Sequence, residues 1–136
     1  MRKLLAIVYF LTVLYITLIS RIGNGHYDYR NYYNLNPLNL TANYKFDYPI
    51  HVIHFLIDFV GNIVMFIPYA VCFYFLTKQE HQITIMIAVF LSTVCIELIQ
   101  YSFYLGVLDM GDVFLNTIGG YLGLIILNKI KITGNK

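Results

Sequence analysis

Four apolar segments of this chain are each about as long as the hydrocarbon core of a bilayer. A helix crosses that core in about 20 residues, with a range of about 17–25. The segments cover residues 4–20, 52–76, 83–105 and 113–130. The apolar part of the last segment ends at Asn128, so this span also needs the turn at Asp112 and residues 129–132 to reach across. The sequence therefore predicts an all-α, polytopic membrane helix bundle with four transmembrane helices.

Composition excludes a water-soluble globular domain. Apolar residue types make up 59% of the 136 residues, whereas Asp, Glu, Lys and Arg make up only 12%; soluble domains average about 25% charged residues. The formal charge of +2 is small and dispersed along the chain, so no nucleic-acid partner is expected. We expect a single transmembrane domain over residues 1–136, whose main partner is the lipid bilayer.

The first span and the cysteines each allow a second interpretation. The span follows Arg2 and Lys3 as the apolar part of a signal peptide would, but no small-x-small cleavage site comes after it, so we expect an uncleaved helix. Cys72 and Cys95 both fall within apolar runs. We therefore expect buried free thiols rather than a disulfide.

The distribution of cations predicts the orientation in the membrane. Six cations fall on one side of the predicted spans: Arg2, Lys3, Lys78, Lys129, Lys131 and Lys136. Three fall on the other side: Arg21, Arg30 and Lys45. The side richer in Lys and Arg is usually cytoplasmic. Both termini and the turn at Lys78 are therefore expected in the cytoplasm.

This orientation makes the long loop at about 21–50 external. The loop is rich in tyrosine, an amphipathic residue that suits the headgroup region: Tyr27, Tyr29, Tyr32, Tyr33, Tyr44 and Tyr48. Its simplest role is an interfacial anchor. The alternative is a lid over a site that faces outward.

Seven acidic and amide residues from the last three spans and the turn before the fourth fall in the half of the membrane that is predicted to be external. They form a candidate polar pocket of seven residues: Asp58, Asn62, Glu97, Gln100, Asp109, Asp112 and Asn116. The members of three pairs are spaced i, i+3 or i, i+4, so each pair shares a helix face: Asp58 and Asn62, Glu97 and Gln100, and Asp112 and Asn116. A charged side chain at the bilayer centre costs at least about 2.5–3.5 kcal/mol, so these faces should point at one another. The alternative is that the amides and acids only link the helices, at about 0.6–2 kcal/mol for each contact.

Small residues and a proline indicate where helices pack. Gly119 and Gly123 form a small-x-x-x-small pattern, which with Gly120 allows close approach of another helix. Pro68 should kink the second span, because it lacks a backbone N–H and clashes with the preceding turn.

No catalytic residues, cofactor or metal site are identified. His51, His54 and Asp58 have ligand-like spacing, but nothing else in the sequence completes a tetrahedral set, so interfacial histidines are the preferred interpretation. The sequence also contains no Gly-rich phosphate loop and no Ser-His-Asp set.

The polar residues fall in stretches that resemble the VanZ-like family of small bacterial membrane proteins. The family patterns are Asn-Leu-x-Pro-Phe, Gly-Asn-(apolar)-Phe-x-Pro-(Phe/Leu)-Gly, Glu-x-x-Gln, and Asp-(Ile/Val)-Asp-Asp-(apolar)₃-Asn-Thr-(apolar)-Gly. The matching stretches, in the same order over about 100 residues, are NLNPL at 34–38, GNIVMFIPY at 61–69, ELIQ at 97–100 and DMGDVFLNTIGG at 109–120. The chain departs from the patterns at Leu38, at Tyr69-Ala70 and at Gly111, which replaces the middle acid.

The resemblance implies a helical protein of the bacterial cell membrane with a role in glycopeptide resistance of the teicoplanin type, but no defined chemical activity. We expect the pocket to engage an envelope lipid, a cell-wall precursor or a lipoglycopeptide, without catalysis. The alternative is an intramembrane enzyme acting on an envelope lipid, with Glu97 or Asp112 as general base or as a ligand of a divalent cation. A third hypothesis is an oligomer, or an assembly factor that binds a membrane protein through the Gly119–Gly123 face.

Overall fold

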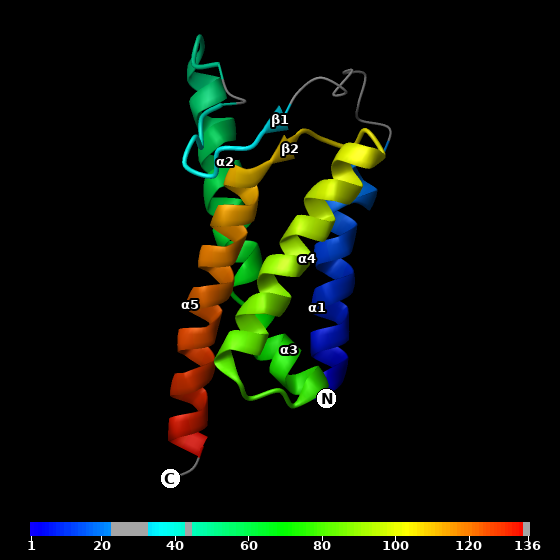
Figure 1. Cartoon of the computed structure of the whole chain (residues 1–136), viewed down its shortest axis with the longest axis vertical. Helices are drawn as coiled ribbons and strands as arrows, with labels where there is room; N and C mark the ends of the chain where they lie inside the picture. The colour runs from blue at the N-terminus through cyan, green and yellow to red at the C-terminus, as the bar shows by residue number, and fades with distance from the viewer. Residues whose placement is uncertain (23–32, 43–44, 135–136) are drawn as a thin grey trace.

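The computed structural model describes residues 1–22, 33–42 and 45–134, and it is built almost entirely of helices (Figure 1). In chain order the elements are α1 (Arg2–Thr17), the 3-10 turn η1 (Ile19–Arg21), β1 (Tyr33–Asn34), α2 (Pro49–Phe66), α3 (Tyr69–Thr77), α4 (Gln82–Ser102), β2 (Leu108–Asp109) and α5 (Met110–Gly134). Four helical stretches are long and apolar enough to cross a membrane: Arg2–Arg21, Pro49–Thr77, Gln82–Ser102 and Met110–Ile132. The predicted all-α bundle with four spans is confirmed.

α5 is the central helix of the bundle. It packs against α2, α3 and α4, whereas α1 packs mainly against α3. Half of the apolar window of α5 is buried inside the chain, compared with 6% for the span that contains α2. The start of α1 and the end of α5 lie at one end of the bundle, which we call the terminal end (Figure 1). β1 and β2 lie at the other, which we call the strand end.

The second span is interrupted at Pro68, where α2 ends and α3 begins. The proline ring has no N–H to donate to Val64, whose carbonyl oxygen instead accepts the N–H of Ile67 at 3.3 Å. The new helix begins with the N–H of Cys72, which donates to the Pro68 carbonyl oxygen at 2.9 Å. The expected kink is therefore a complete break, which places α3 between α1, α4 and α5 at the terminal end.

Glycines allow α5 to approach its neighbours closely. A Cβ on Gly119 would overlap the carbonyl oxygen of Ile63 in α2, and a Cβ on Gly123 would overlap that of Ile67. On the adjacent face, a Cβ on Gly120 would collide with the side chain of Val89 in α4. The Gly119–Gly123 face is thus covered by α2 of the same chain. This face is therefore not free for a partner protein, which corrects the binding surface that the third hypothesis named.

Two apolar clusters hold the helices together. Val13, Phe66, Tyr69, Val89 and Ile96 form the first, and Ala70, Ile85, Leu124 and Leu127 form the second, nearer the terminal end. Many other large apolar side chains face outward from all four spans, as lipid permits.

The cysteines correct one expectation. Both are free, but Cys72 is only half-buried and Cys95 is exposed on the outer face of α4. A thiol is apolar enough to face acyl chains, so its place within an apolar run did not require burial inside the protein.

Candidate functional site

Two short parallel strands hold the described part of the long loop against the start of α5. Tyr33 pairs with Leu108, and Asn34 pairs with Asp109. The Asn34 side chain is buried, and its amide nitrogen donates to Asp109 Oδ1 at 2.8 Å and to the Asn39 carbonyl oxygen at 2.9 Å. The loop segment after β1 is therefore fixed over the strand end rather than extending away from the bundle. Of the loop tyrosines, Tyr33 and Tyr48 are exposed, and the other four lie outside the described residues.

Asp109 links the loop, α4 and α5. Besides Asn34, its Oδ1 accepts the N–H of Gly111 at 2.7 Å, and its own backbone N–H donates to Glu97 Oε2 at 2.9 Å. Glu97 is 2% exposed, so this hydrogen bond is buried between α4 and β2. A Cβ at Gly111 would lie 2.9 Å from Asp109 Oδ1 and 3.2 Å from Leu40 Cδ2. In this arrangement there is little room for the acid that the resemblance places at position 111.

Gln100 and Arg21 connect the site to the end of the first span. The Gln100 side-chain amide donates to the Thr17 carbonyl oxygen at 2.9 Å, which joins α4 to α1. The Arg21 guanidinium lies against Gly106, where a Cβ would be 3.0 Å from Nη1. Arg21 is also close enough to attract the carboxylates of Glu97 and Asp112 electrostatically. Sequence reasoning treated Arg21 only as a loop cation, although its position directly after the first span was a signal that it could reach these acids.

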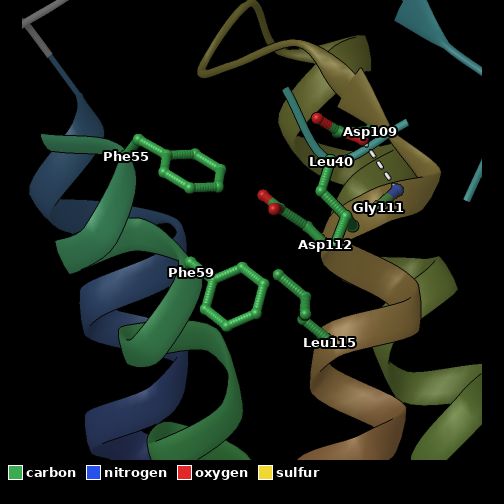
Figure 2. A pocket seen from close by; sticks show the side chains of 7 residues that line it. All are labelled: Leu40, Phe55, Phe59, Asp109, Gly111, Asp112 and Leu115. Atoms are coloured by element: carbon green, nitrogen blue, oxygen red, sulfur yellow. Dashed lines mark hydrogen bonds between the residues drawn. The ribbon is translucent and has the colours of Figure 1, made fainter. Parts of the chain in front are cut away.

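Asp112 lies in the first turn of α5 and faces α2. Its carboxylate accepts a hydrogen bond from the Asn62 side chain. It also lines a small pocket between α2, α5 and the loop, with an empty volume of about 210 Å³ that is partly open to the surroundings. Figure 2 shows Asp112 pointing toward the side of α2 that carries Phe55 and Phe59, below Asp109. The pocket lining comprises Leu40, Phe55, Phe59, Asp109, Gly111, Asp112 and Leu115.

Comparison with known proteins identifies the family to which the chain belongs. Residues 6–131 match the family model described as VanZ/LLP1. The chain belongs to the VanZ/LLP1 family. Protein VanZ of Enterococcus faecium is 28% identical over 129 residues, which cover 90% of this chain and 70% of that protein. No solved structure matches the chain. Family membership and the four apolar spans make this a multi-pass protein of the cell membrane.

The four stretches that carry the VanZ/LLP1 resemblance meet at the strand end. Asn34, Asn62 and Glu97 come from the first three stretches, and Asp109 and Asp112 from the fourth. Asn34 was not among the seven candidate pocket residues, because it lies in the long loop before the last three spans. The motif position itself was the available signal.

Two candidate residues of this VanZ/LLP1 chain have different surroundings. Asp58 is exposed on α2, though close enough to Asp112 to repel it electrostatically. Asn116 is 3% exposed, and its Oδ1 has no hydrogen-bond partner among the described residues. Asn116 lies one helical turn beyond Asp112 and one turn before Gly119 and Gly120. It therefore shares the side of α5 on which Gly119 contacts α2 and Gly120 contacts α4.

The histidines do not form a metal site with the acids in the described ranges. No three His, Cys, Asp or Glu side chains come together there in a group that could hold a metal ion. His51 packs edge-on against Tyr48 with ring centroids 5.5 Å apart, and His54 is exposed.

Proposed function

We propose that this protein contributes to glycopeptide resistance of the teicoplanin type through its strand-end pocket. In this proposal the pocket engages the polar part of an envelope lipid, a cell-wall precursor or a lipoglycopeptide. The observation that carries the proposal is the position of Asp112, which lines a partly open pocket beside Phe55 and Phe59. Pockets that combine apolar walls with a few placed polar groups are the usual form of a ligand site.

The pocket is too small to enclose a whole drug-sized molecule, because its empty volume of about 210 Å³ includes space that is open to the surroundings. Only one polar group of a glycopeptide or lipid would enter, and the rest would lie along the bundle or outside it. The carboxylate of Asp112 and the nearby aromatic rings favour a group that carries N–H donors, an amine above all.

The proposal requires the strand end to face outward, with both termini in the cytoplasm. Support comes from the cations, because Arg2 begins α1, Lys78 follows α3, and Lys131 lies near the end of α5, all at the terminal end. The strand end would then face envelope lipids and drugs that arrive from outside.

The test is teicoplanin susceptibility in a glycopeptide-sensitive bacterium that expresses the protein. Wild type should raise the minimal inhibitory concentration, and Asp112→Asn should abolish that increase while membrane levels of the protein stay equal. The matched control is Asp47→Asn, because Asp47 is an exposed acid before α2 and does not line the pocket. Full resistance in Asp112→Asn would remove the pocket from the mechanism.

The competing hypothesis, an intramembrane enzyme, depends on the same acids. Glu97 already accepts the backbone N–H of Asp109, and Asp112 accepts a hydrogen bond from Asn62, so neither is free of partners. Incubating the purified protein with envelope lipids, with and without EDTA, separates the two hypotheses. Turnover of a lipid that Asp112→Asn abolishes would favour the enzyme.

A further inference from the structure

Three cations from separate segments gather around two aromatic rings at the terminal end. Tyr74 and Phe75 lie near the end of α3 with ring centroids 5.7 Å apart. Arg2 Cζ lies 5.4 Å from the centre of the Phe75 ring, and Lys131 Nζ lies 4.3 Å from that of Tyr74. Lys78 Nζ lies over both rings, 5.3 Å from the centre of the Tyr74 ring and 6.0 Å from that of the Phe75 ring. We call Arg2, Lys78 and Lys131 the cation trio.

The fold brings this trio together, although its members are far apart in sequence. Arg2 begins α1, Lys78 follows α3, and Lys131 lies near the end of α5. α3 contacts both α1 and α5, so its aromatic end is the point where all three segments meet. Figure 1 shows the short helix α3 beside the start of α1 at the terminal end.

The trio carries more positive charge than its surroundings balance. Lys131 forms an ion pair with Glu80 at 3.7 Å. Within the described ranges, Arg2 and Lys78 form no ion pair. Three positive charges against one negative charge leave two in excess. Aromatic faces attract cations but do not cancel their charge, so the three side chains still repel one another. An anion placed between them would relieve that repulsion.

The backbone at Lys78 gives a second indication that this cluster has a function. Lys78 ends α3 in the left-handed conformation, with φ 61° and ψ 18°, and its N–H donates to the Tyr74 carbonyl oxygen at 2.8 Å. Glycine is the usual residue at such a helix end, because a side chain there is strained. Strained positions tend to occur where a side chain is needed for function. Here the strained residue is Lys78, whose ammonium lies over both aromatic rings.

We propose that the cation trio binds the phosphate of an anionic phospholipid. Arg2 and Lys131 lie at the ends of membrane-crossing stretches, Arg2–Arg21 and Met110–Ile132, where lipid headgroups are found. The negative charge of a lipid phosphate would offset part of the positive excess, and Arg binds phosphate through paired N–H donors. The site lies at the opposite end from the Asp112 pocket, so it does not depend on the proposed resistance function.

The test is lipid binding to the whole detergent-purified protein, measured by native mass spectrometry. The probes are dioleoyl-phosphatidylglycerol, whose phosphate charge is not balanced by a cation, and dioleoyl-phosphatidylcholine, in which the choline cation balances the phosphate. Each cation near an anionic lipid contributes about fivefold in affinity. The double variant Arg2→Gln/Lys78→Gln should therefore bind phosphatidylglycerol about 25-fold more weakly, with unchanged phosphatidylcholine binding.

The matched control is Lys3→Gln/Lys129→Gln, which removes the same charge from the same end but leaves the trio intact. It should keep most of the phosphatidylglycerol affinity. Equal losses in the two double variants would overturn the proposal, because general charge attraction would then explain the binding. Equal binding of the two lipids by wild type would overturn it as well, as would inorganic phosphate binding as tightly as phosphatidylglycerol.

A single variant separates lipid binding from folding. Lys78→Gly removes the ammonium and also relieves the left-handed strain, so thermal stability in lipid-free detergent should be maintained or raised. Phosphatidylglycerol affinity should nevertheless fall about fivefold. Wild-type affinity in Lys78→Gly would contradict a role for this side chain and overturn the site.

Discussion

The side chain of Asn34 donates a hydrogen bond to the carboxylate of Asp109 at 2.8 Å, across 75 positions of sequence. The contact is buried, and it lies beside the two residue pairs of the β1–β2 sheet. The same Asp109 Oδ1 caps the backbone of Gly111 at the start of α5. One carboxylate thus holds both the loop that covers the strand end and the first turn of the central helix.

We expect Asn34→Ala to lower the free energy of unfolding by about 1–3 kcal/mol, because the buried Asp109 carboxylate loses a donor. Thermal or denaturant unfolding in detergent measures the change. Asn36→Ala is the matched control: Asn36 Oδ1 accepts an exposed turn hydrogen bond from the Leu38 N–H, and the loss of this bond should cost about 0.5 kcal/mol. Equal effects of the two variants would show that the Asn34–Asp109 contact adds nothing.

Glu97 should tolerate an amide better than a truncation. In Glu97→Gln the side-chain carbonyl can still accept the Asp109 N–H, so stability should stay within about 1 kcal/mol of wild type. Glu97→Ala removes the carboxylate that accepts this buried N–H and should cost about 1–3 kcal/mol or more. Comparing unfolding midpoints in the same detergent tests this. If Glu97→Gln were as unstable as Glu97→Ala, the negative charge rather than the hydrogen bond would be what matters.

A methyl group on the α2-facing side of α5 should be harmful. Gly123→Ala would push a Cβ into the carbonyl oxygen of Ile67, and overpacking of this kind costs about 1–3 kcal/mol or more. Gly61→Ala is the control, since a Cβ there meets nothing within 4 Å and alanine favours the helix by roughly 0.5–1 kcal/mol. Thermal stability and elution as a single species in detergent report the result. A stable Gly123→Ala protein would contradict the close packing of α2 on α5.

Cysteine labelling tests the expected orientation. In a chain with Cys72 and Cys95 replaced by Ala, a membrane-impermeant maleimide should label Leu38→Cys on intact cells. Glu80→Cys, in the turn between α3 and α4, should react only after permeabilisation. Leu38 and Glu80 are both well exposed, so access to the reagent depends on the side of the membrane alone. Labelling of position 80 on intact cells would reverse the orientation.

The spans could be predicted closely, because each depends on a property of its own segment. Crossing a bilayer requires a long run of apolar residues, and that run is visible in the sequence. The predicted 83–105 span ends three residues beyond the end of α4 (Gln82–Ser102). The helix predicted at 113–130 is longer in the structure, Met110–Gly134. The predicted and observed helix ends differ because helix termini depend on caps and on local contacts as much as on hydropathy.

Other features depend on contacts between segments. The placement of Arg21 beside acids of α4 and α5, and that of Asn34 against Asp109, follow from how the loop and helices pack. Cys95 faces outward and Asp58 is exposed for the same reason, since hydropathy does not indicate which face of a span meets the rest of the chain.

The sequence by itself determined that this chain is a four-span helical membrane protein, and its motif stretches indicated the family. Hydrophobic length and local residue order carry that information, and neither needs a partner segment. Only the tertiary structure decided that Gly119 and Gly123 are used inside the chain against α2, and that Arg2, Lys78 and Lys131 meet around α3. The physical reason is the break at Pro68, which separates α2 from α3 and so sets which helix faces can touch.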